Sequence, residues 1–393
     1  MNSWLRAILV CISTILPFAN SAYAANIVQI TIDEMGIPFV LDDKGHVWGF
    51  REPRGLQHPI KLPNLEHIKR IAPYIALDDE GRVFTWGIDD NKVNADQGEI
   101  IEAGYTEPQR FGDLKGVTMI AHSMNHFFAV VDNQEILEWI VIRKGNEPGG
   151  GFGIEGYGPV RSLISRSGIV GIAAAPGTME RVVSEPAPFG LVALFADGEV
   201  IGWGINSSGQ ILREANSNSV LLTKLPGAIG IAMNAFHVVV LTASGVPRFW
   251  GGCDIYGRDG QDSGRLWTYG SVHGTDGFVS DVIAVALAQD INTGGAGGWG
   301  NDNNVPDVFL KRDGTVWIAN APLPTGAPNI ACGQYNSQID YQQEVQIAAG
   351  KTKATQVITS TGRIIMLDAD HQLWMAPSNH RVKDFRRLML SFE

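Results

Sequence analysis

The sequence predicts an all-β chain folded as a β-propeller, with seven blades of mostly four-stranded antiparallel sheets. Three observations predict it. A tryptophan recurs in one local setting, a hairpin turn precedes each of these tryptophans, and the repeats are long enough for a four-stranded unit. Units of this length arranged in a ring give a propeller, because each sheet buries its faces against the two neighbouring sheets.

Seven of the ten tryptophans share the repeated setting. The longer version is seen in GRVFTWG (81–87) and GEVIGWG (198–204), where the tryptophan follows the turn glycine by five residues. In the shorter version GHVWG (45–49) it follows by three. Side chains alternate across a strand with a period of two, so both offsets place the ring on the same face. The seven residues are Trp48, Trp86, Trp139, Trp203, Trp250, Trp317 and Trp374.

A turn signal precedes each of these tryptophans. An apolar run ends in Asp-Gly or a related turn, as in FVLDDKG (39–45) and ALFADG (193–198), and alternating apolar residues follow. Such turn residues tolerate positive φ, so the pattern predicts a β-hairpin in every unit. The tryptophans lie between 38 residues (Trp48 to Trp86) and 67 residues (Trp250 to Trp317) apart. This spacing leaves room for two further strands per unit and predicts loop insertions of different length.

The stretch ALFADGEVIGWGINSSGQ (193–210) resembles the repeat of the regulator-of-chromosome-condensation family. A unit of that family contains, in order, an apolar strand, Asp-Gly, Val, Trp-Gly, Asn and Gly-Gln. His126 and His237 stand at the family's His position ahead of the strand, and we interpret both as structural imidazoles bonded to backbone between blades. The resemblance covers about residues 30–376. It implies a seven-bladed propeller, in a family whose members mostly act as binding scaffolds. Pro247 in place of the usual Val, and units without Gly-Gln, depart from the pattern.

The two ends of the chain predict three segments. Residues 1–24 contain one positive charge, a short apolar run and an Ala-x-Ala cleavage signal, which together indicate a secretory signal peptide. We expect cleavage near Ala24, localisation in the periplasm or outside the cell, and hence an exported bacterial member of the family. Residues 25–379 then form the propeller, in which one blade shared between the termini would close the ring. Residues 380–393 form a C-terminal tail packed on the ring.

Charge and hydropathy limit the partners. Removing the leader leaves 29 Lys and Arg residues against 41 Asp and Glu residues, a net charge of −12. Nucleic-acid affinity comes largely from clustered Lys and Arg, so this balance argues against a nucleic-acid partner. No later apolar stretch is long enough to span a membrane. We expect a monomer without a cofactor that binds a protein partner.

Two cysteines, Cys253 and Cys332, remain after the leader is removed. Export passes the chain through an oxidising compartment, where a disulfide can form. The sequence does not supply the Cα separation that a disulfide needs, so a bridge and two buried thiols both stay open. Two cysteines without neighbouring ligands are too few for a structural zinc site, and no metal site is predicted.

The stretches outside the repeats hold the candidate binding residues. Aromatic and Arg side chains on irregular loops are common anchors of protein interfaces, although such rings can also simply cover blade edges. Clustered Asp residues within 88–99 lack the spacing and glycine of a calcium-binding EF-hand loop. The candidates are Arg51, Asp89, Asp90, Asn206, Tyr256, Arg258, Trp267, Tyr269 and Trp299.

No catalytic residues are predicted, and a G-x-S-x-G nucleophile motif is absent. The predicted function is therefore non-enzymatic: the propeller binds another protein through its blade loops, as an inhibitor, adhesion protein or scaffold. Two alternatives stay open. One is a propeller lyase or hydrolase with a channel-facing acidic or metal site, since a fold does not determine chemistry. The other is a carbohydrate-binding module that uses Trp267 and Trp299 as stacking platforms.

Overall fold

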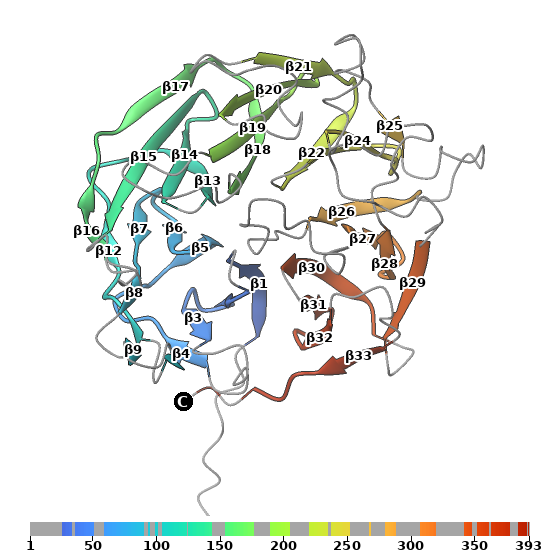
Figure 1. The fold of residues 1–393 in the computed structure, drawn as a ribbon, viewed down its shortest axis with the longest axis horizontal. Coiled ribbons are helices and arrows are strands. Elements are labelled where there is room, and N and C mark those ends of the chain that lie inside the picture. Colours follow the sequence, from blue (N-terminus) through green and yellow to red (C-terminus); the bar gives the residue numbers. More distant parts are fainter. Residues whose placement is uncertain are drawn as a thin grey trace, which may run out of the picture.

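The computed structural model confirms the predicted seven-bladed β-propeller. Its described residues form strands and contain no helix, and seven blades stand around a common axis (Figure 1). Residues 1–25, which include the predicted signal peptide (1–24), lie outside this description. The structure describes residues 26–33, 36–50, 59–89, 93–94, 99–100, 104–123, 125–143, 154–176, 189–204, 220–234, 237–251, 267–268, 280–287, 307–319, 342–347, 352–360, 363–377, 384–390 and 392.

Each blade is an antiparallel sheet in which the chain runs from the axis outwards, and we call its successive strands A to D. Blade 1 consists of β1 (Ile27–Ile32), β2 (Pro38–Asp42), β3 (Val47–Phe50) and β4 (Pro59–Lys61); blade 2 of β5 (Ile68–Ala72), β6 (Ile75–Asp78), β7 (Val83–Thr85) and β12 (Gln109–Arg110); and blade 3 of β13 (Val117–Ser123), β14 (His126–Val131), β15 (Glu135–Arg143) and β17 (Arg161–Ser165).

The other four blades repeat this order. Blade 4 consists of β18 (Ile169–Pro176), β19 (Phe189–Phe195), β20 (Glu199–Gly204) and β21 (Val220–Lys224); blade 5 of β22 (Ala228–Met233), β23 (His237–Thr242), β24 (Pro247–Gly251) and β25 (Trp267–Thr268); blade 6 of β26 (Val282–Ala286), β27 (Asp307–Lys311), β28 (Val316–Ala319) and β29 (Gln342–Ile347); and blade 7 of β30 (Ala354–Ser360), β31 (Arg363–Asp368), β32 (Leu373–Pro377) and β33 (Asp384–Arg387).

Insertions between strands C and D account for the remaining strands. In blade 2, β8 (Ile88–Asp89) pairs with β11 (Gly104–Tyr105), and β9 (Val93–Asn94) pairs with β10 (Glu99–Ile100). In blade 3, β16 (Ile154–Tyr157) adds a fifth strand by pairing with the end of β15. These insertions agree with the unequal tryptophan spacing.

The core lies in layers between adjacent blades, and the repeated tryptophans fill it. Trp86 of blade 2 packs edge-on against Phe39 of blade 1, with 5.7 Å between ring centroids. Trp139 of blade 3 stacks on Phe111 beside blade 2, at 4.2 Å. Each of the other five likewise packs in a cluster shared with the preceding blade. The prediction that both versions of the repeat place the tryptophan on the same face is confirmed.

The hairpin turn between strands B and C is built around a buried aspartate in several blades. In blade 1, Asp42 Oδ1 accepts hydrogen bonds from the main-chain N–H groups of Lys44 (2.9 Å) and His46 (2.8 Å). The turn glycine, Gly45, has φ of 79°, a conformation that glycine adopts without strain. The other carboxylate oxygen of Asp42 accepts from Trp48 Nε1 at 3.1 Å. The aspartate thus fixes both the turn and the ring that follows it.

The ring closes between blade 7 and blade 1 without a shared blade, which corrects the sequence-based hypothesis. Strands β1–β4 all come from the N-terminal part of the chain, and β30–β33 all come from the C-terminal part. His371 Nδ1 lies 2.8 Å from the carbonyl oxygen of Ile27, and Trp48 packs against Phe392 at 4.9 Å between centroids. Within the stretch assigned to a tail, residues 384–387 form β33, which pairs with β32 and, in parallel, with β29.

Candidate functional site

Every innermost strand carries a β-bulge at the same place. In all seven A strands the pairing with strand B shifts register around the second residue of the strand. A bulge re-aims the extra side chain, so seven equivalent side chains stand around the axis. The main-chain N–H of the residue before the bulge donates to the carbonyl oxygen of a glycine in the B–C turn of the preceding blade. Val282 donates to Gly245 and Ala354 donates to Gly314, both at 3.0 Å. The bulge residues are Val28, Lys69, Thr118, Val170, Ile229, Ile283 and Thr355.

Polar bulge residues bond to their own blade. Lys69 Nζ donates to the carbonyl oxygen of Asp79 at 3.0 Å, and Thr118 Oγ1 donates to that of Val130 at 3.3 Å. Thr355 Oγ1 similarly donates to Leu367 O at 3.2 Å. In blades 2, 3 and 7 the bulge side chain is therefore held by a hydrogen bond within its own blade.

All four aliphatic bulge residues are exposed to solvent: Val28 of blade 1 is 37% exposed, and the other three lie in consecutive blades. Val170, Ile229 and Ile283 of blades 4, 5 and 6 are 50%, 57% and 41% exposed. We call these three residues the apolar arc. Single exposed aliphatic side chains are ordinary on protein surfaces, whereas exposed apolar side chains that gather on one surface can mark an interaction site.

The residue after the bulge faces the next blade around the ring. In blade 1 this residue is Gln29, whose Nε2 donates to the carbonyl oxygen of Ile71 (2.8 Å) and whose Oε1 accepts from the N–H of Ile71 (3.0 Å). In blade 7 it is Gln356, which donates to Val28 O at 2.5 Å and accepts from the N–H of Ile30 at 3.1 Å. Each carboxamide thus binds main-chain groups on the inner edge of the following blade. We call this arrangement the glutamine clamp.

Blades 4, 5 and 6 have small residues at the clamp position: Gly171, Gly230 and Ala284. A Cβ atom added to Gly230 would touch Leu241 of its own blade at 3.7 Å, an ordinary contact, and nothing from blade 6 within 4 Å. The missing side chain leaves a groove of about 230 Å³ between blades 5 and 6.

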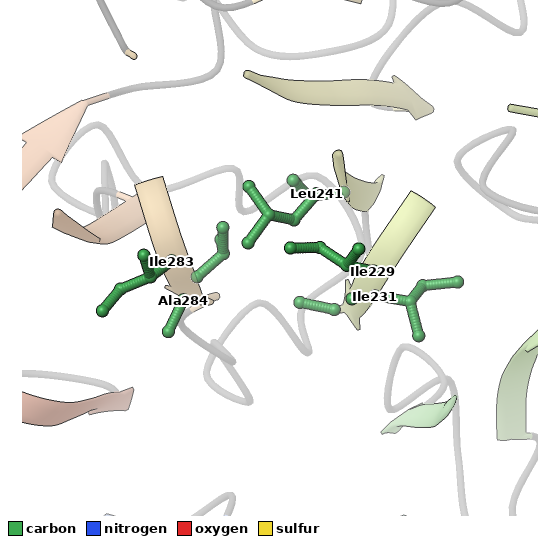
Figure 2. A pocket seen from close by; sticks show the side chains of 9 residues that line it. Ile229, Ile231, Leu241, Ile283 and Ala284 are labelled. Carbon is green, nitrogen blue, oxygen red and sulfur yellow. The ribbon is translucent and has the colours of Figure 1, made fainter. Parts of the chain in front are cut away.

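Figure 2 shows this groove between the two blades. Its walls come from β22 and β23 on one side and from β26 on the other. Among the described residues, those that line it are all aliphatic or glycine, and none is ionisable. Its lining residues are Ile229, Gly230, Ile231, Ala232, Val239, Leu241, Ile283, Ala284 and Val285.

A second cluster lies inside blade 3 around Glu138, which is fully buried. Its Oε1 lies 2.7 Å from His126 Nδ1, and its Oε2 accepts from Arg161 Nη2 at 2.7 Å. Burial raises the pKa of Glu138, but the hydrogen bond and charge of His126, and then Arg161, outweigh it and hold the pKa below its ordinary value. Both carboxylate oxygens are occupied, so this cluster fixes the blade and offers no free acid or base.

This cluster refines the interpretation of the repeated histidines. His126 is structural, as expected, but its ring bonds to the side chain of Glu138 on the neighbouring strand of its own blade. It also contacts Phe189 of blade 4, at 4.5 Å between ring centroids. His237 begins β23, and its side chain lies outside the described residues.

The loop residues predicted from the sequence fall mostly outside the described part of the chain. Asp89 ends β8 and Trp267 begins β25, and nothing is described of their side chains. Within the described ranges, no three His, Cys, Asp or Glu side chains gather as metal ligands would. In the same ranges no helix is long and apolar enough to cross a membrane. Outside the description lie Arg51, Asp90, Asn206, Tyr256, Arg258, Tyr269 and Trp299, together with Cys253 and Cys332.

Sequence reasoning missed the apolar arc and the groove. The repeat was recognised from the B–C hairpin, whereas these residues stand on strand A. The available signal was the contrast between Gln at 29 and 356 and Gly at 171 and 230, which occupy the third position of equivalent strands. Finding it requires an alignment of the A strands, including the bulge.

Comparisons with known proteins show the fold. No family model and no curated protein sequence matches the chain. Among solved structures, yeast RCC1 (Prp20), determined with Kap60 bound, shares 16% sequence identity over 86% of this chain and 78% of that one, with a TM-score of 0.51. Human WBSCR16 shares 12% identity over 93% of this chain and 82% of that one, with a TM-score of 0.47. YCF48 bound to a D1 peptide shares 8% identity over 90% of this chain and 92% of that one, with a TM-score of 0.46. The chain therefore has a β-propeller fold like that of RCC1.

Proposed function

We propose that this protein is an exported, non-enzymatic propeller that binds another protein through the apolar arc and the adjoining groove, in an inhibitor, adhesion or scaffold role. The observation that carries the proposal is the run of three exposed aliphatic bulge residues in consecutive blades, with a groove between two of them. Leaving such side chains in water forgoes the stabilisation that their burial would give. A partner that covers them recovers it.

The lining of the groove favours protein over other ligands. Carbohydrate recognition by stacking needs aromatic rings, and all nine lining residues are aliphatic or glycine. Hydrolysis or elimination needs a group that transfers protons, and the groove offers none. Pockets for drug-sized molecules commonly enclose about 300–1,000 Å³, more than the 230 Å³ here. One or two apolar side chains of a protein fit this space.

The leader sequence supports export, and the net negative charge of the chain supports a partner with a basic surface. The leader at residues 1–24 has the pattern of a cleaved secretory signal, and the net charge of −11 favours partners with a basic contact surface. The yeast RCC1 structure with Kap60 bound provides an example of a propeller of this fold in a protein complex. Amino-terminal sequencing of the mature protein tests export, and we expect the first residue to be Ala25.

Site-specific photocrosslinking tests the proposed surface. A photoreactive amino acid replaces Ile229 of the groove or, as a matched control, Leu221 of β21, since the two side chains are 57% and 58% exposed. We expect one partner to crosslink at position 229 and not at 221. We also expect Ile229→Asp to abolish its capture and Leu221→Asp to leave it unchanged. Equal crosslinking at both positions, or capture that survives Ile229→Asp, would show that this surface is not the binding site.

A further inference from the structure

The glutamine clamps show what chemistry the inner edge of a blade recognises. Gln29 approaches the inner edge of β5 and exchanges two hydrogen bonds with a single residue, Ile71, donating to its C=O and accepting from its N–H. The N–H and C=O of one residue in an extended chain point to the same side, so they present a donor and an acceptor as a carboxamide does. A peptide in an extended conformation makes the same pair of bonds when it adds to the edge of a sheet.

The same edge recurs in blade 6, where the described residues of blade 5 supply no clamp. Val285 is the counterpart of Ile71, because each lies two residues after the bulge of its A strand. The preceding blade presents Gly230 there in place of Gln29, and glycine has no side chain to reach across. The groove occupies the space that a glutamine side chain would cross.

From this contrast we infer that the groove between blades 5 and 6 receives an extended peptide segment of the partner protein. One apolar side chain of that segment fills the groove against Ile229 and Ile283. The main-chain N–H and C=O of one residue of that segment bind the inner edge of β26 at Val285, as the carboxamide of Gln29 binds Ile71. The inference rests on the proposed function and specifies how the partner is recognised.

The charge of the protein determines which residues are favoured on either side of the central residue of the peptide. The chain has 30 Lys and Arg residues against 41 Asp and Glu residues, while the groove itself is uncharged. Apolar contact therefore determines the central residue, and the acidic field of the whole protein favours Lys or Arg on either side of it. The expected ligand is a basic segment with one Leu, Ile or Val at its centre.

Methyl NMR with defined peptides tests this inference on the full mature chain. The probes are acetyl-Lys-Thr-Leu-Thr-Lys-amide, the same peptide with N-methyl-leucine at the centre, and the same peptide with Glu in place of both Lys. The reporters are the δ1 methyl groups of Ile229 and Ile283. We expect the first peptide to shift both signals saturably. N-methylation, which removes one donor, should weaken binding about tenfold, the equivalent of one hydrogen bond. The Glu-flanked peptide should also bind more weakly.

Substitutions at the clamp position provide a more specific test of where the peptide binds. Gly230→Gln gives blade 5 the residue that forms the clamp in blades 1 and 7, so it should close the groove and abolish peptide binding while the protein stays folded. Gly156→Gln is the matched control, because a side chain there meets nothing within 4 Å and lies on β16. Ile283→Glu is a second disrupting variant at a residue that is 41% exposed and so tolerates a polar side chain.

The outcomes separate this inference from the proposed function. Equal affinity for the Leu and N-methyl-Leu peptides, or unchanged binding by folded Gly230→Gln, would overturn the strand-like mode. If no peptide shifts the methyl signals while a partner still crosslinks at position 229, the inference fails and the proposed function stands. If the signals shift with protein concentration alone, the occupant is a second copy of the chain, and the inference fails. Loss of both peptide binding and crosslinking would remove both proposals.

Discussion

Replacing Glu138 by glutamine should destabilise the propeller through blade 3. The carboxylate of Glu138 is fully buried, with His126 on one oxygen and Arg161 on the other, each at 2.7 Å. Glutamine has nearly the same shape, but it is uncharged and has only one acceptor oxygen. The charge-assisted hydrogen bonds to the two partners are therefore weakened or lost.

The burial of the two partners determines the size of the effect. The side chain of His126 is 3% exposed, whereas that of Arg161 is 57% exposed. The exposed ion pair with Arg161 contributes at most about 1 kcal/mol, because solvent screens it. Removing one partner of a buried pair costs about 3–5 kcal/mol, and glutamine keeps part of the interaction. We expect the free energy of unfolding to fall by about 2–3 kcal/mol for Glu138→Gln, and by more for Glu138→Ala.

The pKa of Glu138 gives this prediction a pH dependence. Burial raises the pKa, but His126 and Arg161 outweigh burial and hold it below the ordinary value of 4.5. A carboxylate whose pKa is lower in the folded state stabilises the protein fully above its unfolded pKa, and this stability is lost as the pH falls through the folded pKa. The difference between wild type and Glu138→Gln should therefore be largest near neutral pH and should narrow below pH 4.5.

Urea unfolding at pH 7 and pH 4, followed by tryptophan fluorescence, measures both effects. Glu135→Gln is the matched control, because Glu135 starts the same strand and is only partly buried. It should change the free energy of unfolding by less than about 0.5 kcal/mol. If Glu138→Gln behaves like this control at pH 7, or if its difference from wild type grows at pH 4, the reasoning is refuted.

Three further predictions concern the turns and the clamp. Trp374→Phe should lower the free energy of unfolding by about 1.5–3 kcal/mol, because Trp374 Nε1 donates to the carboxylate of Asp368 at 2.6 Å. Trp203→Phe should lower it by less, because the buried Nε1 of Trp203 has no partner among the described residues. Thermal unfolding of both variants tests this order. Gln29→Ala should lower the free energy of unfolding by about 1–3 kcal/mol through two lost interblade hydrogen bonds, measured by urea unfolding. Gly198→Ala should reduce soluble yield and melting temperature, since its φ is 85° and a Cβ would lie 2.3 Å from a carbonyl oxygen; an unchanged melting temperature would contradict it.

The fold was predictable because its determinants are local. The aspartate, the turn glycine and the tryptophan lie within about seven residues of one another, and each acts through the hairpin that contains it. Asp368 and Trp374 repeat the hydrogen bond of Asp42 and Trp48 at the opposite end of the chain. A pattern this short is visible in the sequence without knowledge of the partner blades.

Ring closure and the site were less predictable because they depend on contacts distant in sequence. Gln356 binds Ile30 across 326 residues, and no local pattern indicates that pair. The groove depends on the absence of a side chain at Gly230, which acquires meaning only when the facing strand of blade 6 is known. The loop candidates were chosen because loops commonly carry function, whereas the arc stands on strands.

The clamp explains why we propose a binding site at this point of a nearly regular ring. An innermost strand pairs on one edge only, so the main-chain groups on its other edge need another partner or water. Gln356 and Gln29 provide such a partner at blades 1 and 2. Where the clamp residue shrinks to Gly230, the chain gives up that internal contact and exposes Ile229 as well, both of which cost stability. The proposed peptide would compensate both losses at once, because its main chain offers a donor and an acceptor and its central side chain is apolar.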